Sequence, residues 1–213
     1  YIEHQVVRNG VEALGGDVSK IRVVLMQFVR LIRNGKEYKM STRAGNYETL
    51  DDLIDQTSAD AVRYLLLARS TDSRLDFDLD LAVKQTNENP VYYIQYAYVR
   101  CSGILREAKA RGFSDEGAVN LALLGEDELA FLRKILTLPE EIHAAATDLM
   151  PHGIAFYALE LAKAFQSVYD RVRVFGDGVT DEEARARLRF YRASLTAFAR
   201  VLSLMGMSKP ERM

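Results

Sequence analysis

The chain has 213 residues with 28 Lys and Arg, 30 Asp and Glu, and a formal net charge of −2. This length corresponds to one large or two small domains, and 48% hydrophobic residues are enough for a buried core. The charge balance excludes a disordered tail and a basic nucleic-acid-binding arm, so any contact with a polyanion must come from a local patch.

The single cysteine, Cys101, excludes an internal disulfide, and no apolar run approaches the roughly 18 residues that span a bilayer. The sequence begins without Met and without the basic and apolar segments of a targeting peptide. We therefore expect a cytoplasmic protein and a piece of a longer chain.

The first part of the chain has the pattern of the end of an α/β domain. Apolar residues at helical spacing predict a helix over 1–14, which Gly15-Gly16 ends. Residues 21–32 are dense in β-branched and bulky apolar side chains, which predicts a buried strand that becomes more exposed.

A hairpin and a polar loop are predicted next. The Asn34-Gly35 pair favours a tight turn, so we expect 36–39 to return antiparallel to 28–32. Residues 39–46 are polar and precede the capping-box pattern Thr49-x-x-Asp52, which predicts a loop in front of a helix.

The next segment connects this part to a long helical region. A helix is predicted from Ser58 to near Ser70, and the strict alternation over 75–81 predicts a short strand or extended link. Pro90 restricts the residue before it and suits the first turn of a helix, so we place a domain border there.

From Pro90 onward the sequence predicts an antiparallel helical bundle. Short turns at Pro139, at Pro151 and over 175–179 separate the helices. The expected helices cover 90–111, 126–138, 139–149, 151–174 and 181–205. The predicted fold is mainly α, with a C-terminal antiparallel helical bundle preceded by the C-terminal piece of an α/β domain, and the expected divisions are 1–57, 58–88 and 89–213.

Candidate metal ligands fail the tests of spacing. Asp76, Asp78 and Asp80 resemble the start of a calcium loop, but its sixth and twelfth positions hold Leu81 and Asn87 instead of Gly and Glu. The Glu140-x-x-His143 pair lacks the second copy and the further carboxylates of a bundle metal site. We expect no metal site.

Cys101 falls on the apolar face of its helix, with no basic cluster or triad partner near it in sequence. We therefore interpret this cysteine as a core residue.

The loop after the hairpin has a composition suited to a nucleotide triphosphate. It holds two cations, a pair of hydroxyls and a glycine, which together can grip phosphates and release pyrophosphate. A solvated basic loop is the alternative interpretation of this composition. Its residues are Lys39, Met40, Ser41, Thr42, Arg43, Ala44, Gly45 and Asn46.

This loop resembles the KMSKS signature of class I aminoacyl-tRNA synthetases, in the form used by arginyl-tRNA synthetase. Three downstream segments look like the junction and anticodon-binding region of the same family, and the resemblance covers essentially the whole chain. These segments are Asp60-Ala61-Val62-Arg63-Tyr64, Asp76-Phe77-Asp78-Leu79-Asp80 and Asn87-Glu88-Asn89-Pro90-Val91-Tyr92-Tyr93, and the ending Pro210-Glu211-Arg212-Met213 agrees with them.

The resemblance implies ATP-dependent attachment of L-arginine to tRNA(Arg) through arginyl-adenylate, with ATP and Mg²⁺ used by the full enzyme and no DNA or membrane partner. Lys39 and Ser41 match the signature loop, whereas Thr42 replaces the lysine usual at the fourth position. We expect Arg43, or a lysine outside this chain, to supply the missing charge. The His-x-Gly-His motif of the family does not occur here, so the chain corresponds to the C-terminal end of a Rossmann-like catalytic domain followed by the anticodon-binding bundle, and alone it should be inactive.

Tyrosines and an arginine next to the core stripe of the helix after Pro90 form a candidate RNA-binding edge. At about 100° per residue, Tyr93, Tyr96 and Arg100 fall together roughly a quarter turn from the apolar stripe. Rings and guanidinium groups placed in this way can stack on unpaired bases, although tyrosines flanking a core with their hydroxyls in water are also common. The resemblance adds Tyr157 and Met213 as candidates for tRNA contact, and a core aromatic residue is the alternative for Tyr157.

Two other functions remain open. The chain could be a free-standing tRNA-binding module without catalysis, or a helical bundle whose tyrosine and arginine stripe binds a partner protein.

Overall fold

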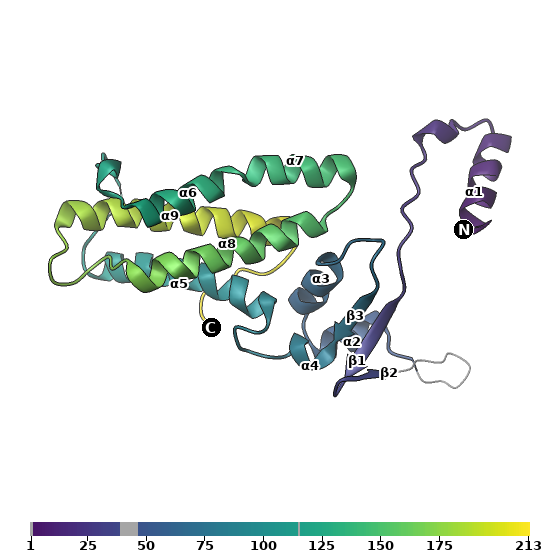
Figure 1. Cartoon of the computed structure of the whole chain (residues 1–213), viewed down its shortest axis with the longest axis horizontal. Helices are drawn as coiled ribbons and strands as arrows, with labels where there is room; N and C mark the ends of the chain where they lie inside the picture. The colour runs from purple at the N-terminus through teal and green to yellow at the C-terminus, as the bar shows by residue number, and fades with distance from the viewer. Residues whose placement is uncertain (1, 39–46, 115) are drawn as a thin grey trace.

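The computed structural model describes residues 2–38, 47–114 and 116–213 of the chain (Figure 1). A long helical bundle occupies one side, a small α/β part lies at its end, and an extended segment leads from this part to an N-terminal helix (Figure 1). The loop 39–46, and with it Lys39, Met40, Ser41, Thr42 and Arg43, lies outside the described residues.

The N-terminal segment differs from the strand predicted over 21–32. Helix α1 covers Ile2–Ala13 and a short 3-10 helix covers Val18–Lys20, but the first strand, β1, begins only at Val29. Between them the chain is extended and most of its apolar side chains are exposed, Phe28 to 92%. The strand prediction for 21–28 is therefore wrong for the described structure, because an apolar run forms a buried strand only where neighbouring strands and helices cover it.

A small sheet carries the predicted hairpin. Strand β1 (Val29–Arg33) pairs antiparallel with β2 (Lys36–Tyr38) and parallel with β3 (Leu75–Asp78), in the order β2-β1-β3. Asn34 and Gly35 adopt φ angles of 52° and 69°, as a type I′ turn requires. The hairpin prediction is confirmed, with Leu31 opposite Tyr38.

Short helices cover the sheet and connect it to the bundle. Helix α2 (Leu50–Gln56) begins with the predicted capping box of Thr49 and Asp52, and α3 (Ala59–Leu67) follows directly. Strand β3 ends at Asp78, and α4 (Leu79–Ala82) takes up the second half of the alternating stretch predicted as extended. The strand gives way to a helix at Asp78, whose carboxylate caps α4 by accepting a hydrogen bond from the backbone of Leu81.

The bundle has the predicted helices with small shifts at their ends. Helix α5 starts at Pro90, and Asn89 caps it through its side chain. The expectation of a mainly α fold with a C-terminal bundle is confirmed. The elements are α5 (Pro90–Ala110), a 3-10 helix at Leu121–Leu123, α6 (Glu126–Leu136), α7 (Leu138–Asp148), α8 (His152–Arg171) and α9 (Asp181–Leu204).

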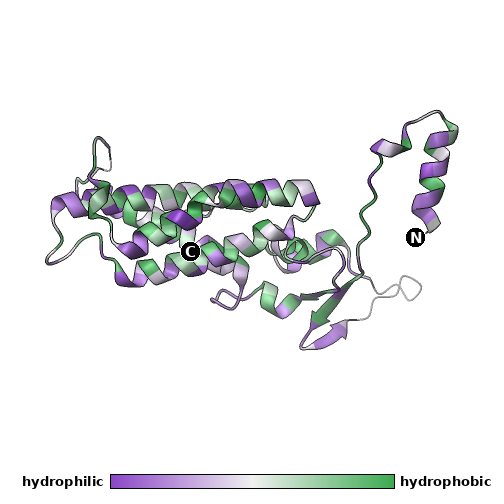
Figure 2. Ribbon diagram, turned by 45° about the horizontal axis from the view of Figure 1, so that its top comes forward, coloured by the Kyte–Doolittle hydropathy of each residue, from purple (hydrophilic) through white to green (hydrophobic). Residues whose placement is uncertain are grey.

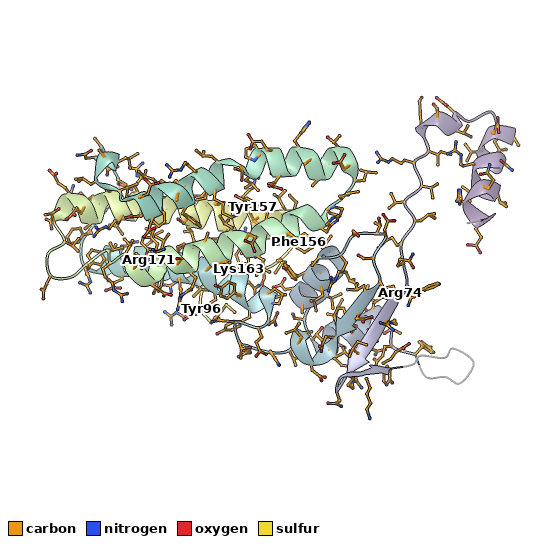
Figure 3. The ribbon with its side chains drawn as sticks, in the orientation of Figure 1. Arg74, Tyr96, Phe156, Tyr157, Lys163 and Arg171 are labelled. Atoms are coloured by element: carbon orange, nitrogen blue, oxygen red, sulfur yellow. The ribbon has the colours of Figure 1, made fainter. Side chains whose placement is uncertain are left out.

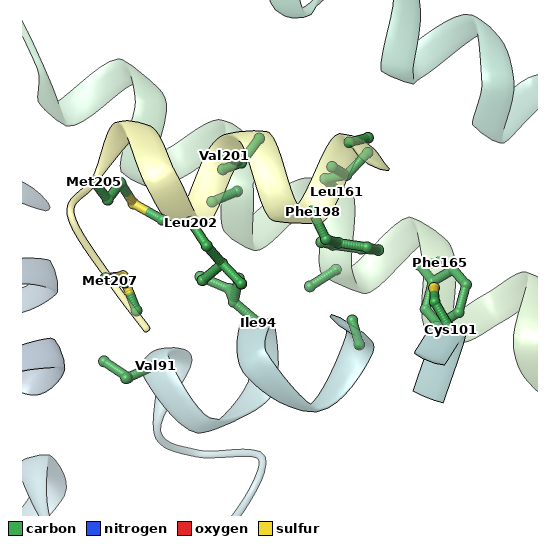
Figure 4. Close-up of a cluster of buried hydrophobic side chains, with 14 of the residues drawn as sticks. Val91, Ile94, Cys101, Leu161, Phe165, Phe198, Val201, Leu202, Met205 and Met207 are labelled. Atoms are coloured by element: carbon green, nitrogen blue, oxygen red, sulfur yellow. The ribbon is translucent and has the colours of Figure 1, made fainter. Parts of the chain in front are cut away.

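The core of the bundle lies where α5, α8 and α9 face one another (Figure 4). Apolar and polar stretches alternate along these helices (Figure 2), as expected for helices that bury one face. Cys101 is fully buried in this core, which confirms its interpretation as a core residue, and burial raises the pKa of its thiol well above the usual value.

Helix α3 of the α/β part contacts the bundle through the side chain of Tyr64. Tyr64 is buried, and its hydroxyl donates a hydrogen bond of 3.4 Å to the backbone carbonyl of Ala155 in α8. Burial raises the pKa of Tyr64 to about 12, so this hydroxyl stays protonated at neutral pH.

We predict that Phe165→Ala lowers the free energy of unfolding by about 3–5 kcal/mol. Phe165 has no exposed surface, and its ring lies 5.7 Å from that of Phe131 and 5.5 Å from that of Phe198, so truncation leaves a cavity. Urea titration followed by circular dichroism measures the change. Phe156→Ala is the control on the same helix, because Phe156 is 49% exposed, and equal losses for the two variants would contradict this account of the core.

Candidate nucleic-acid interface

Packing of α5 decides which of its side chains reach the surface. Ile94 and Cys101 are fully buried against α8 and α9. Tyr93, Tyr96 and Arg100 lie beside this buried stripe and are half-buried, so each offers part of its side chain to solvent. The placement at the edge of the core agrees with the helical spacing from which these residues were predicted.

A row of stacked groups connects α5 to α8. The rings of Tyr92 and Tyr96 lie 5.7 Å apart with an interplanar angle of 19°, which is a stacked arrangement. The guanidinium carbon of Arg100 lies 4.3 Å from the ring centroid of Tyr96 and 4.3 Å from that of Tyr169. Arg100 also donates hydrogen bonds to the side-chain oxygen of Gln166 and to the Tyr96 hydroxyl.

These contacts hold the guanidinium of Arg100 between the rings of Tyr96 and Tyr169, an arrangement that we call the clamp. A guanidinium group over an aromatic face is held by electrostatic attraction to the ring, and here it has such a face on both sides. The clamp fixes the half-buried ring of Tyr96 beside that of Tyr92. We call these residues the tyrosine face: Tyr92, Tyr93, Tyr96 and Arg100 of α5, with Gln166 and Tyr169 of α8.

Tyr93 has a mixed electrostatic environment. Partial burial raises the pKa of its hydroxyl, while the positive charges of Arg100 and Lys163 act in the opposite direction. The hydroxyl is therefore neutral at physiological pH and can donate a hydrogen bond to an acceptor on a ligand.

A pocket of about 400 Å³ lies at the border between the α/β part and the bundle, beside the tyrosine face. Tyr92 lines it from α5, Lys84 from the segment after α4, and Arg212 and Met213 from the C-terminal end. Met213 is 48% exposed there. The structure thus brings Met213 next to Tyr92, which itself stacks on Tyr96.

Tyr157 lies elsewhere. The residue is 5% exposed, and its hydroxyl donates a hydrogen bond of 2.9 Å to the backbone carbonyl of Lys134 near the end of α6. Figure 3 labels Tyr157 on α8 near the end of α6, and Tyr96 at the lower edge of the bundle on α5. The burial of Tyr157 agrees with the alternative interpretation, that it is a core aromatic residue. Its contact with tRNA stays a prediction.

Three members of the tyrosine face were missed in the sequence. Tyr92 stands four residues before Tyr96 and eight before Arg100, so helical spacing could have added it. Gln166 and Tyr169 belong to α8, and no local pattern indicates which side of α8 meets Arg100.

The carboxylates considered for calcium have other partners. Asp76 accepts two hydrogen bonds from Arg30, Asp78 caps α4, and Asp80 accepts from the backbone of Asn34. Within the described ranges, no group of three or more His, Cys, Asp or Glu side chains could hold a metal ion. Nor does this part of the chain contain a helix that is both long and apolar enough to cross a membrane.

Comparison with known proteins gives a consistent result. The DALR anticodon binding domain model matches residues 94–213. The arginine–tRNA ligase of Desulforudis audaxviator is 44% identical over 211 residues, and the match covers 97% of this chain and 37% of that protein. The ligase of Heliobacterium modesticaldum is also 44% identical, with 97% and 38% covered, so the chain spans less than half the length of these relatives.

Solved structures agree with these sequence relatives. The arginyl-tRNA synthetase structure from Campylobacter jejuni superposes with a TM-score of 0.84 at 28% identity and covers 97% of this chain and 44% of that one. The arginyl-tRNA synthetase of Thermus thermophilus has the same fold, with a TM-score of 0.63 at 23% identity over 80% of this chain and 29% of that one.

We predict that Tyr157→Phe lowers the free energy of unfolding by about 1 kcal/mol, because α8 loses its hydrogen bond to the carbonyl of Lys134, which keeps only its donors from Thr137. Tyr92→Phe is the matched control, since the Tyr92 hydroxyl makes no hydrogen bond among the residues that the structure describes. Urea unfolding of both variants measures the difference. Equal stability of the Tyr157 variant and the unaltered chain would show that this hydroxyl does not hold α8 to α6.

Proposed function

The chain belongs to the DALR anticodon binding domain family, and we propose that it is the C-terminal region of an arginyl-tRNA synthetase acting in the cytoplasm. In this proposal the full enzyme uses ATP, with Mg²⁺, to join L-arginine to tRNA(Arg) through arginyl-adenylate. The bundle supplies recognition of the anticodon loop, and the loop 39–46 closes over ATP.

The observation that carries the RNA-binding half is the clamp of Arg100 between Tyr96 and Tyr169. It presents aromatic rings at the surface in fixed positions, and base–aromatic stacking is the main interaction by which proteins hold unpaired nucleotides. The anticodon loop of a tRNA contains such unpaired bases. Tyr93, Tyr96 and Arg100 are the proposed stacking and phosphate contacts.

The neighbouring pocket extends this surface toward the α/β part. Met213 contributes an apolar contact, and Arg212 supplies a cation for the RNA backbone. Local cations such as Arg212 and Arg100 allow a chain with a net charge of −2 to bind a polyanion. Binding is therefore expected to weaken as the salt concentration rises.

The catalytic half of the proposal concerns residues outside the described structure. Lys39 and Ser41 match the signature loop, and positive charge on this loop stabilises the phosphates as pyrophosphate leaves. Thr42 brings no charge, so we assign the missing cation to Arg43.

We predict that Tyr96→Ala weakens binding of tRNA(Arg) by about 1–3 kcal/mol, because the stacked row loses its middle ring and no longer holds Tyr92 and Arg100 in place for the RNA. Tyr96→Phe is the matched control, since it keeps the ring and removes only the hydroxyl. Fluorescence titration of the chain with labelled tRNA(Arg) at fixed salt measures both affinities.

The same titration with a tRNA of altered anticodon loop separates the alternatives. Discrimination against the altered tRNA supports anticodon recognition. Equal binding of the two tRNAs, with no effect of Tyr96→Ala, would instead favour a bundle that binds a protein partner. An anticodon-dependent chain whose gene carries no upstream nucleotide-binding domain would be a tRNA-binding module without catalysis.

We predict that Arg43→Ala in the full-length enzyme slows formation of arginyl-adenylate, because the loop loses a positive charge over the triphosphate. ATP–pyrophosphate exchange measures this step. Arg111→Ala, which removes an equal charge at the far end of α5, is the control. An unchanged exchange rate for Arg43→Ala would reject the assignment of the missing charge to this residue.

A further inference from the structure

The C-terminal residues 206–213, which we call the tail, leave α9 through a defined turn. Gly206 has a φ angle of +67°, its amide donates to the carbonyl of Ser203, and the Met207 amide donates to that of Leu202. This pair of hydrogen bonds is a Schellman motif, which ends a helix and fixes the direction of the chain that follows. Met207 is then buried at 4% exposure, so the tail begins against the body of the protein.

One face of helix α3 packs against this turn and carries Asp60 and Arg63. The guanidinium of Arg63 lies so close to Gly206 that a Cβ atom there would come within 2.8 Å of its Nη1. Asp60 stands three residues before Arg63, hence on the same side of α3. The segment Asp60-Ala61-Val62-Arg63 therefore presents both of its charged side chains to the tail.

Asp60 binds the tail directly. One carboxylate oxygen accepts a hydrogen bond of 2.9 Å from the backbone amide of Ser208, and the other accepts from the Ser208 hydroxyl. Gln95 of α5 donates a bond of 2.7 Å to the same carboxylate, and its amide nitrogen also lies 3.2 Å from the Ser208 carbonyl. Gln95 is 7% exposed, so this network is shielded on one side from solvent.

The network joins α3, α5 and the tail, and Asp60 and Ser208 are 148 residues apart in sequence. Hydrogen bonds to a charged acceptor are among the stronger ones in proteins, and a carboxylate that accepts several of them holds its donors in one geometry. Arg106 adds a second attachment by donating to the carbonyl of Glu211 at 2.9 Å. Beyond these two points the tail reaches the pocket that Arg212 and Met213 line with Tyr92.

We propose that Asp60 is a positioning residue for RNA binding, which acts by holding the tail so that Arg212 and Met213 complete the pocket beside the tyrosine face. This inference rests on the proposed function, because it assigns Asp60 a role in the binding of the same tRNA. Asp60 itself makes no contact with the RNA. Its carboxylate is engaged by Ser208 and Gln95, and it acts through the tail.

The test compares Asp60→Ala with Ser208→Ala in the 213-residue chain, and uses Asp51→Ala as the matched control. Asp51 is also an acid in the first turn of a neighbouring helix, so its removal reproduces the loss of charge without loosening the tail. Hydrogen exchange followed by mass spectrometry reports the tail directly. We expect exchange in 206–213 to become about tenfold faster in Asp60→Ala, less so in Ser208→Ala, and to stay unchanged in Asp51→Ala.

Titration with tRNA(Arg) tests the functional part, both in the intact chain and in a chain that ends at Ser208. We expect Asp60→Ala to weaken binding about threefold to tenfold in the intact chain and to have no effect in the shortened one. A merely structural role would weaken binding equally in both backgrounds, so equal losses would overturn the proposal. Unchanged tail exchange in Asp60→Ala would also overturn it.

The results that would reject the proposed function differ from those that would reject the role of Asp60. If the unaltered chain shows no affinity for tRNA(Arg), anticodon recognition is rejected together with the RNA-binding role of Asp60. If Tyr96→Ala weakens binding but Asp60→Ala does not, anticodon recognition stands and the positioning role alone is overturned.

Discussion

The burial of one stripe of α5 between α8 and α9 is the constraint on which the rest of the structure depends. Once Ile94 and Cys101 face the core, the pitch of the helix leaves Tyr96 and Arg100 at its edge, against α8. The same rotation places Gln95 toward α3 and the tail. The tyrosine face and the hydrogen-bond network of the tail therefore both depend on the rotation of α5 about its own axis.

Features set by neighbours in sequence could be predicted from the sequence. The hairpin at Asn34-Gly35 depends on two residues that tolerate positive φ, and the start of α5 depends on Asn89 and Pro90. The bundle helices follow from the apolar period, since each must bury one face. Within the candidate site, the same period brought Tyr93, Tyr96 and Arg100 to one edge.

Features set by distant contacts could not be predicted in this way. Tyr169 meets Arg100 only because α8 packs at a particular rotation, which the pattern of α8 alone does not fix. Residues 21–28 have the composition of a buried strand, yet burial depends on elements that cover it. The burial of Tyr157 could not be predicted for the same reason. Helical spacing gives the direction of its side chain, but it does not show that α6 covers this side of α8. The bond between Asp60 and Ser208 has no local signal.

The clamp around Arg100 also bears on the thermodynamics of recognition. Free tyrosine and arginine side chains sample several rotamers, and a ligand that orders them loses part of its binding energy to the entropy of that ordering. In this chain Tyr96 and Arg100 are already ordered by Tyr169 and Gln166. In the proposed function the RNA would therefore meet a preorganised row of rings, and Gln166 and Tyr169 would influence affinity by holding Arg100.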